Sequence, residues 1–353
     1  MTSARRIPAE QLEQFTRECL AAVGLPAEDA AAVAELMCEA DLNGSDGHGI
    51  FRLPQYIKRI ESGGINVKPD IRFVREQPAS AVIDGDDAMG HLVMRHAARV
   101  AIDKARTEGV AWVGARNSNH AGPAALYAKM PLAHDMIGLY IAVGNANHLP
   151  PWGGTEMLLS TNPIAVAIPT QNEPPIVLDM ATTVAAYGKV KTAAQRGETM
   201  PEGWMIDLEG KPLTDPKRAD EGFLLPIGGA KGYGLALVFG LLAGTLNGAA
   251  FGKDVIDFNA DSVTPTNTGQ LIVAISVEAF ADVAAFKRAV DAAIASMHAS
   301  PTLPGFDTVR VPGENSHAVR LERAAEGIPI HPGLLGALGE LGEKLGVAPL
   351  AQD

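Results

Sequence analysis

The spacing of apolar residues predicts three helices at the start of the chain. Over about the first 65 residues, apolar side chains return every three or four positions, as on the buried face of a helix. Breaks fall at Leu25-Pro26, in a glycine-rich loop over residues 43–49, and at Gly63-Gly64. The helices are expected over residues 8–23, over about residues 28–42, and through Leu53, Tyr56, Ile57 and Ile60.

The pattern changes near Pro69, where short apolar runs begin to alternate with helical segments. Such alternation is typical of an α/β domain with a largely buried sheet. Strands are expected at residues 81–84, 110–115, 136–143, 164–168, 176–179 and 271–276. Helices are expected at about residues 90–108, 122–133, 183–196, 232–247 and 281–298.

This change of pattern predicts two domains. Residues 1–68 are expected to form a helical domain, joined by C-terminal helices within about residues 312–353. Residues 69–311 are expected to form the α/β domain. The most apolar run, residues 232–251, is broken by five glycines and an asparagine, so we interpret it as a buried helix rather than a membrane span.

Charge and cysteine content narrow the function classes. The formal net charge is −12, which disfavours nucleic acid and anionic membranes as partners. An anionic substrate then requires a locally basic pocket. Cys19 and Cys38 form no CxxC pair, and the N-terminal residues lack an apolar signal core. We therefore expect a soluble, cytoplasmic protein without disulfides.

Several common motifs are absent from the sequence. No GxGxxG follows a strand, and neither Gly188-Lys189 nor Gly252-Lys253 completes a phosphate-binding loop. No HExxH is present, and His91 and His96 are five residues apart, which does not place two ligands on one helical face. The sequence thus predicts no metal site and no Rossmann-type nucleotide site.

The first polar cluster surrounds a histidine that lies between two glycines. His48 is flanked by Gly47 and Gly49 at a loop-to-helix junction, where its ring is free to approach a ligand. Histidine titrates near neutral pH and can exchange a proton with a carbinol oxygen. Arg52 follows one helical turn later and can clamp a carboxylate through two parallel hydrogen bonds. A simple helix-capping loop with a solvated His and Arg is the alternative interpretation.

A second cluster, residues 116–122, follows the expected strand over residues 110–115 and contains Asn119 and His120. Sites in α/β proteins form where strands end at their carboxyl side, so these residues could orient a substrate oxygen. An ordinary turn at a helix start would look similar.

A third cluster covers residues 144–154 and continues to residues 160–163. Amide side chains and exposed backbone N–H groups in such loops can hold a pyrophosphate without a Rossmann turn. A purely structural Asn/Gly/Pro loop remains the alternative.

A fourth cluster pairs residues 178–183 with residues 229–234, each at the start of an expected helix. Free N–H groups and Lys231 could bind phosphate there, and Asp179 could hold a ribose hydroxyl. A solvated lysine and a capping aspartate are the ordinary explanation for either feature alone.

Together, the four clusters resemble the malate/L-lactate dehydrogenase family of the non-Rossmann type. The resemblance runs over nearly the whole chain. It is carried by DLNGSDGHGIFRLPQYIKRIESGGIN, NSNHAG, PPWGGTEMLLSTNPIAVAIPT, LDMATTVAAYGKV, RGETMPEGWMID, LTDP and GGAKGYGLAL. Relatives include ureidoglycolate and sulfolactate dehydrogenases, diketogulonate reductase and piperideine-carboxylate reductases. The resemblance implies a homodimer, and a three-layer α/β/α nicotinamide-binding domain with a mixed sheet beside the helical domain.

The resemblance also implies roles for individual residues. His48 and His120 match the two histidines that act as acid/base in different members, and Arg52 matches a binder of the substrate carboxylate. His120 and Asn119 are further expected substrate contacts. Cofactor contacts are expected at Asn145, Thr161, Asn162, Asp179, Met180, Ala181, Lys231, Gly313, Glu314 and Asn315. The cofactor is NAD or NADP, with NAD favoured, and no metal takes part.

The sequence departs from the family pattern at Gly47, where relatives usually have serine. Its absence removes a hydroxyl beside His48 and argues against a Ser-His relay. We expect hydride transfer between NAD(P)H and a small 2-oxo acid or 2-hydroxy acid, with His48 moving the proton and His120 polarising the carbonyl. The alternatives are a reductase of a cyclic imino acid C=N bond and a non-catalytic ligand-binding dimer.

Overall fold

The elements of the fold follow one another as helices, then alternating strands and helices, then helices again. The computed structural model describes residues 4–350. Its α-helices are α1 (Ala9–Ala22), α2 (Ala27–Leu42), α3 (Leu53–Glu61), α4 (Gly90–Glu108), α5 (Ala125–Ala128), α6 (Tyr187–Arg196), α7 (Ala230–Ala243), α8 (Val283–His298), α9 (Glu314–Glu326) and α10 (Pro332–Leu345). Its strands are β1 (Arg5–Ile7), β2 (Arg72–Gln77), β3 (Ser80–Ala88), β4 (Val110–Ser118), β5 (Met136–Ala142), β6 (Ile164–Ile168), β7 (Ile176–Met180), β8 (Met205–Asp207), β9 (Gly222–Leu224), β10 (Gln270–Ser276) and β11 (Ile328–Ile330).

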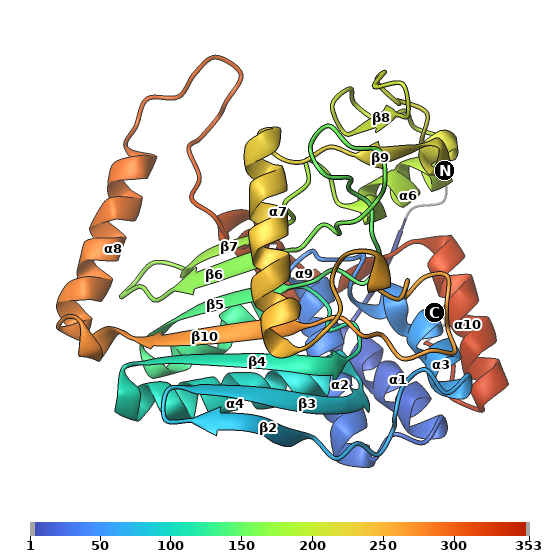
Figure 1. Ribbon diagram of the computed structural model, residues 1–353, viewed down its shortest axis with the longest axis horizontal. Coiled ribbons are helices and arrows are strands. Elements are labelled where there is room, and N and C mark those ends of the chain that lie inside the picture. Colours follow the sequence, from blue (N-terminus) through green and yellow to red (C-terminus); the bar gives the residue numbers. More distant parts are fainter. Residues whose placement is uncertain (1–3, 351–353) are drawn as a thin grey trace.

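A mixed seven-stranded sheet forms the centre of the molecule, in the order β2-β3-β4-β10-β5-β6-β7. Only β3 and β4 pair in parallel, and the other neighbours are antiparallel. Figure 1 shows α7 crossing one face of this sheet while α4 covers the other. Successive residues of β10 serve the two faces: Ile272 packs on the α4 side and Leu271 on the α7 side. The strand is therefore apolar throughout, as its sequence indicates.

The register of the sheet brings several strand ends to one edge. Gln270, the first residue of β10, pairs with Ala115 near the end of β4 and with Ala142 at the end of β5. Ile164, the first residue of β6, pairs with Ile141 and with Met180 at the end of β7. The polar segments that follow β4, β5 and β7 therefore leave the sheet on the same side.

The N-terminal helices build a second apolar core together with the end of the chain. Leu12, Phe15 and Tyr56 of α1 and α3 pack with Leu338 of α10, and β1 pairs with β11. Helices from near both ends of the described chain thus share one apolar core. Phe258, from the loop before β10, also joins this core and ties it to the sheet.

Two expected helices differ from the structure, and a six-residue strand at the sheet edge was not expected. The helix expected over 122–133 is reduced to α5 and a 3₁₀ turn over Met130–His134, because Pro123 and Pro131 interrupt the hydrogen-bond ladder. The segment expected as a helix from 183 starts as extended chain, with Val184 donating to the carbonyl of Leu225, and α6 begins at Tyr187. The strand β2 was not predicted, because all six of its residues are exposed.

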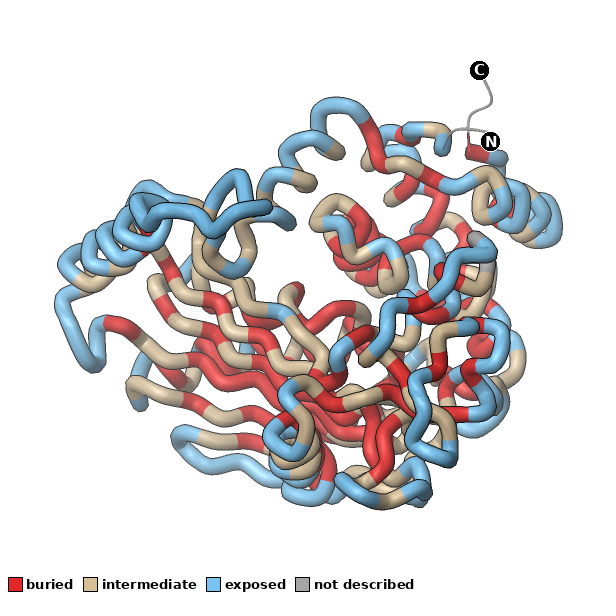
Figure 2. The backbone as a smooth tube through the Cα atoms, turned by 90° about the horizontal axis from the view of Figure 1, so that it is seen from above, coloured by how far each residue is buried: buried red, intermediate tan, exposed pale blue. Residues whose placement is uncertain are grey.

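Burial is greatest along the central strands, and α8 is exposed over most of its length (Figure 2). Within residues 4–350, no helix is both long and apolar enough to cross a membrane. Cys19 and Cys38 are both buried free thiols.

Candidate active site

Two imidazole rings meet where the helical region contacts the sheet. His48 comes from the loop before the 3₁₀ turn Ile50–Arg52, and His120 comes from the segment after β4. Their ring centroids are 5.6 Å apart and the rings are nearly parallel, at 14°. Phe258 stacks on His120 as well, with centroids 5.3 Å apart. The two histidines that the sequence singled out are therefore neighbours, although 72 positions separate them in the chain.

The neighbours of His120 determine which of its nitrogens carries the proton. Its Nδ1 lies 2.6 Å from the hydroxyl of Tyr56 and 3.3 Å from the backbone nitrogen of Gly122. A backbone N–H can only donate, so Nδ1 accepts, and the Tyr56 hydroxyl donates to the same nitrogen. The proton of neutral His120 is then on Nε2. Sequence analysis placed Tyr56 only on the apolar face of α3, and nothing in its spacing indicated this contact.

The electrostatic environment keeps both imidazoles neutral at physiological pH. Burial, and then the positive charge of Arg52, lower the pKa of His48 to about 4. Burial is the main cause that lowers the pKa of His120 well below its usual value, and Arg52, His48 and His91 add to this effect. Desolvation disfavours the charged form of a histidine, and a nearby cation adds to that effect. A neutral imidazole can accept a proton from a substrate hydroxyl.

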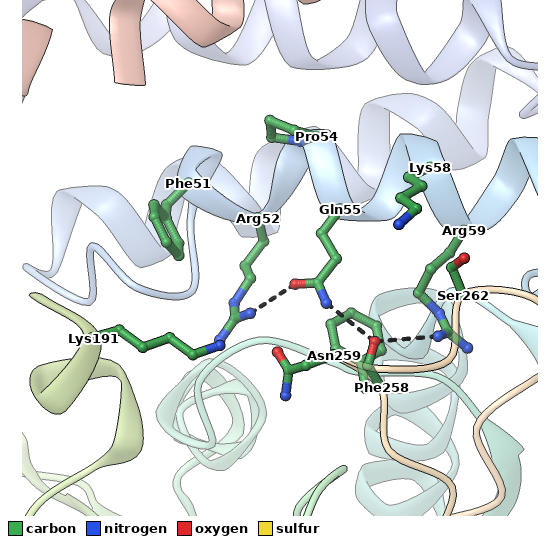
Figure 3. A pocket seen from close by; sticks show the side chains of 10 residues that line it. All are labelled: Phe51, Arg52, Pro54, Gln55, Lys58, Arg59, Lys191, Phe258, Asn259 and Ser262. Atoms are coloured by element: carbon green, nitrogen blue, oxygen red, sulfur yellow. Dashed lines mark hydrogen bonds between the residues drawn. The ribbon is translucent and has the colours of Figure 1, made fainter. Parts of the chain in front are cut away.

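Arg52 is oriented by neutral acceptors and has no acidic partner among the described residues. Its Nε donates to the carbonyl oxygen of Gly47 at 2.9 Å, and one terminal nitrogen donates to Oε1 of Gln55 at 2.7 Å. Gln55 in turn donates to the carbonyl oxygen of Phe258 (Figure 3). Three of the five guanidinium N–H donors therefore remain for a ligand. Such an arrangement suits a carboxylate.

A small cavity of about 430 Å³ and a large one of about 1230 Å³ are lined by different members of this group. Arg52 and Phe258 line the small cavity, and His48 lines the large one. His48 therefore faces a space large enough for a nucleotide, and Arg52 faces a space suited to a small molecule.

The large cavity contains many of the residues expected to bind a cofactor. Thr161, Asp179, Met180, Ala181 and Gly313 all line it. Asp179 is open to the cavity and its Oδ2 accepts the backbone N–H of Ala125 at 2.9 Å. Burial by the surrounding protein raises its pKa, while the Ala125 N–H and Lys129 act in the opposite direction.

The backbone at Gly313 is packed so closely that only glycine fits. Its φ is +101°, and an added Cβ would lie 2.8 Å from the backbone nitrogen of Val177 in β7. This contact anchors the N-terminus of α9 at the cavity wall. Gly313, Glu314 and Asn315 were all expected to contact the cofactor. Gly313 lines the cavity, whereas Glu314 is hydrogen-bonded to His298 and Asn315 is exposed.

Three other expected contacts lie outside the walls of both cavities. Asn162 is fully buried, and its amide links Gly144 to the carbonyl oxygen of Ala236 in α7. Asn145 donates to the hydroxyl of Thr268. Lys231 is exposed in the first turn of α7. These positions favour structural roles for the two asparagines, and Lys231 lies four residues after Ile227, which lines the large cavity.

Asn119 also has a structural environment. It is fully buried, and its amide nitrogen donates to the carbonyl oxygens of Asp87 and Ala88. Its side-chain oxygen accepts from Thr266. Its position therefore favours holding His120 in place over the substrate contact that we expected.

Sequence analysis missed the cationic residues of the large cavity. Lys129, Lys189 and Arg320 all line it. Lys129 and Arg320 both pair with Glu39, at 2.9 and 3.0 Å. Although burial raises the pKa of Glu39, its bonds to these cations lower it to about 2. Lys129 directly follows α5, Lys189 lies on α6 and Arg320 lies on α9, so only the fold reveals them as a group.

The residues present fit a nicotinamide dinucleotide better than a metal. The large cavity contains a carboxylate, which can bind ribose hydroxyls, and several cations, which can bind phosphates. The closely packed backbone at Gly313 forms part of its wall. Within residues 4–350, no group of three or more His, Cys, Asp or Glu residues is placed to hold a metal ion.

Comparison with known proteins agrees with this geometry. The family model described as malate/L-lactate dehydrogenase matches residues 7–339. The malate dehydrogenase of Pyrococcus abyssi is 38% identical, over 98% of this chain and 96% of its own. The ureidoglycolate dehydrogenase (NAD(+)) of Escherichia coli K12 is 34% identical, over 92% of each chain.

A solved structure shows the same fold. The sulfolactate dehydrogenase from Methanocaldococcus jannaschii is 39% identical and superposes with a TM-score of 0.90, covering 97% of this chain and 98% of its own. The match of the family model and of these relatives spans both the helical region and the sheet. The chain therefore belongs to the malate/L-lactate dehydrogenase family.

Proposed function

We propose that this protein is an NAD(P)-dependent 2-hydroxy acid dehydrogenase, which in reverse reduces a 2-oxo acid. The observation that carries the proposal is the placement of Arg52: a guanidinium with no acidic partner among the described residues, which lines the small cavity and lowers the pKa of two buried imidazoles. The names of the relatives support the same class of reaction.

Arg52, His48 and His120 have separate roles in the proposed reaction. Arg52 binds the substrate carboxylate, which places the second carbon and its oxygen beside the histidines. A nicotinamide cofactor, when bound in the large cavity, would supply or accept the hydride at that carbon. In the oxidative direction His48 takes the proton from the hydroxyl group, and Nε2–H of His120 donates a hydrogen bond to the same oxygen.

Substrate binding also prepares His48 for the reductive direction. The positive charge of Arg52 lowers the pKa of His48 in the free enzyme. A carboxylate on Arg52 neutralises that charge, so the pKa of His48 rises when a 2-oxo acid binds. The imidazole can then take up the proton that it must return to the carbonyl oxygen. The carboxylate thus acts on both affinity and proton transfer.

For the cofactor, we infer NAD ahead of NADP. Asp179 lines the large cavity, and a carboxylate accepts hydrogen bonds from ribose hydroxyls but repels a ribose phosphate. The NAD(+) in the name of one relative supports this preference. We also propose a cytoplasmic location, which the two unpaired thiols support.

A spectrophotometric assay tests the function. The purified protein, with NADH or NADPH, is given a panel of 2-oxo acids and a cyclic imino acid, and absorbance of the reduced nicotinamide is followed. We expect oxidation of NADH with at least one 2-oxo acid. Turnover of the cyclic imine alone, or of nothing in the panel, would contradict the proposal.

We further propose a homodimer, in which α7 contacts the second copy. One side of α7 packs small residues, Ala236, Gly240 and Ala243, onto the body of the protein. Its other side exposes Leu235, Val238 and Leu241, and Val238 is 51% exposed. A helix that is apolar on all sides is normally buried, and the family resemblance supports a second copy as the cover.

Light scattering coupled to gel filtration tests this interface. We expect the mass of a dimer for the wild type and of a monomer for Val238→Asp, because a charge in the buried contact is unpaired. Leu208→Asp serves as the control, since Leu208 is 65% exposed and follows β8, on a different segment from α7. A monomeric wild type, or equal masses for both variants, would contradict the interface.

A further inference from the structure

Helix α6 contributes residues to both cavities. Lys191 lines the small cavity (Figure 3), and Gly188, Lys189 and Thr192 line the large one. All four residues lie on the same helix, Tyr187–Arg196. Because a helix moves as a rigid element, a displacement of α6 changes the walls of both cavities at once. The position of this helix therefore matters for both binding spaces.

The helix belongs to a segment that branches off the central sheet. This branch segment, residues 184–225, lies between β7 and α7 in the chain and includes β8 and β9 (Figure 1). Its two ends are joined, because Val184 donates to the carbonyl oxygen of Leu225 at 2.9 Å and Ile227 donates to that of Thr182 at 3.0 Å. The helix packs into an apolar core formed by residues of the branch segment alone. That core therefore does not fix α6 relative to the sheet.

A stacked pair of rings joins the start of α6 to the loop after β5. The rings of His148 and Tyr187 are nearly parallel, at 9°, with centroids 4.1 Å apart. His148 belongs to that loop, and its backbone N–H donates to the carbonyl oxygen of Leu159 at 2.9 Å. Its own carbonyl oxygen accepts the N–H of Leu224 at 3.0 Å, near the end of the branch segment. His148 thus contacts the branch segment through its ring and through its backbone, and a substitution can remove the ring contact alone.

The stack continues to the cation of the small cavity. The nitrogen of Lys191 lies 5.5 Å from the centre of the Tyr187 ring, one helical turn earlier in the chain. Burial lowers the pKa of His148 to about 4; Asp257 acts in the opposite direction and Lys191 adds to the effect of burial. His148 is therefore neutral near pH 7 and stacks as an uncharged ring.

We propose that the His148–Tyr187 stack positions α6, so that one helix completes the site for the 2-oxo acid and the site for the nicotinamide cofactor together. This inference rests on the proposed function, which assigns these ligands to the two cavities. His148 and Tyr187 are then positioning residues, which act through Lys191 on the small cavity and through residues 188–192 on the large one. Without the stack, α6 occupies other positions for part of the time. The affinity for each ligand then falls with the fraction of molecules in which α6 is in place.

Calorimetric titration with NADH, together with steady-state kinetics on the 2-oxo acid of the panel that is reduced fastest, tests this proposal. For His148→Ala we expect the dissociation constant of NADH and the KM of the 2-oxo acid to rise together. Each should rise about threefold to tenfold, the fold-change that one aromatic pair contributes. With both ligands saturating, kcat should fall less than about twofold, because bound ligands hold α6 in place. His148→Phe keeps a flat, uncharged ring and should restore both constants.

Tyr187→Leu removes the same stack from the other side and keeps an apolar side chain for the core of the branch segment. It should match His148→Ala, and the double variant should lose no more than either single variant, because both remove one contact. His96→Ala is the matched control. It removes a half-buried histidine that contacts the Phe73 ring, and neither of these residues lines a cavity. This control should leave both constants unchanged.

Unchanged NADH affinity in His148→Ala, or additive losses in the double variant, would overturn the proposal. A rise in only one of the two constants would also overturn it, since α6 would then not act as a unit. Thermal melting followed by circular dichroism measures structural damage separately. A lower Tm in His148→Ala without recovery of both constants in His148→Phe would mean that the stack serves stability alone. A wild type that binds no NADH, or reduces no 2-oxo acid, would instead remove the proposed function.

Discussion

Replacement of His48 by alanine is expected to lower kcat about a hundred- to ten-thousand-fold, the usual contribution of general acid–base catalysis. His48 faces the large cavity, its pKa of about 4 makes it a neutral base, and Arg52 links that pKa to substrate binding. Cofactor affinity should be unchanged. Stopped-flow kinetics under single-turnover conditions, together with a calorimetric dissociation constant for NADH, measure the two quantities separately.

His120→Ala is the informative comparison, because its ring is restrained differently. Tyr56 and Gly122 both donate to Nδ1, which leaves Nε2 protonated and able to donate but not to accept. His120→Ala should therefore raise KM more than it lowers kcat. Tyr56→Phe removes one of these donors and should produce part of the same effect. If His120→Ala has the larger effect on kcat, the two histidines have the opposite roles.

Replacement of Arg52 by methionine is expected to lower kcat/KM about a hundred- to a thousand-fold for every 2-oxo acid, because the substrate carboxylate then lacks its charged partner. The variant should also shift the pH dependence of hydroxy acid oxidation. The charge of Arg52 lowers the pKa of His48, so its removal raises that pKa. The acidic limb of the kcat/KM profile, which reports protonation of the free enzyme, should move to higher pH.

Arg52→Lys separates the two effects of this side chain. Lysine keeps the positive charge but loses the planar fork that binds a carboxylate at two points. This variant should lose substrate affinity while its acidic limb stays close to that of the wild type. NMR titration of the histidine rings gives an independent reading. An acidic limb that does not move in Arg52→Met would mean that burial alone sets the pKa of His48.

The sequence was most informative where neighbouring residues carry the signal. The six expected strands are all present, because apolar runs flanked by turns mark a buried strand locally. The positions of His48 and Arg52, one helical turn apart, follow from the same local geometry. Sequence reasoning was less successful over residues 122–133, where apolar content suggested a helix and Pro131 ended it.

The roles of the asparagines show a different limit. Asn119, Asn145 and Asn162 appeared in polar loops after expected strands, which is where ligands bind. In the structure their amides hold backbone or side-chain groups of distant segments. A polar residue in such a loop can satisfy the protein or a ligand, and only its surroundings distinguish the two.

The sequence by itself determined the family, the α/β class, the strands and the two histidines with their arginine, because these depend on local spacing and on motifs. Only the tertiary structure decided which of these residues meet. Pairing of Gln270 with both Ala115 and Ala142 brings the ends of β4 and β5 together. The Tyr56 contact with His120, and the approach of Lys191 to Arg52, join segments far apart in the chain. Such contacts arise from packing between elements, which the period of a single element does not encode.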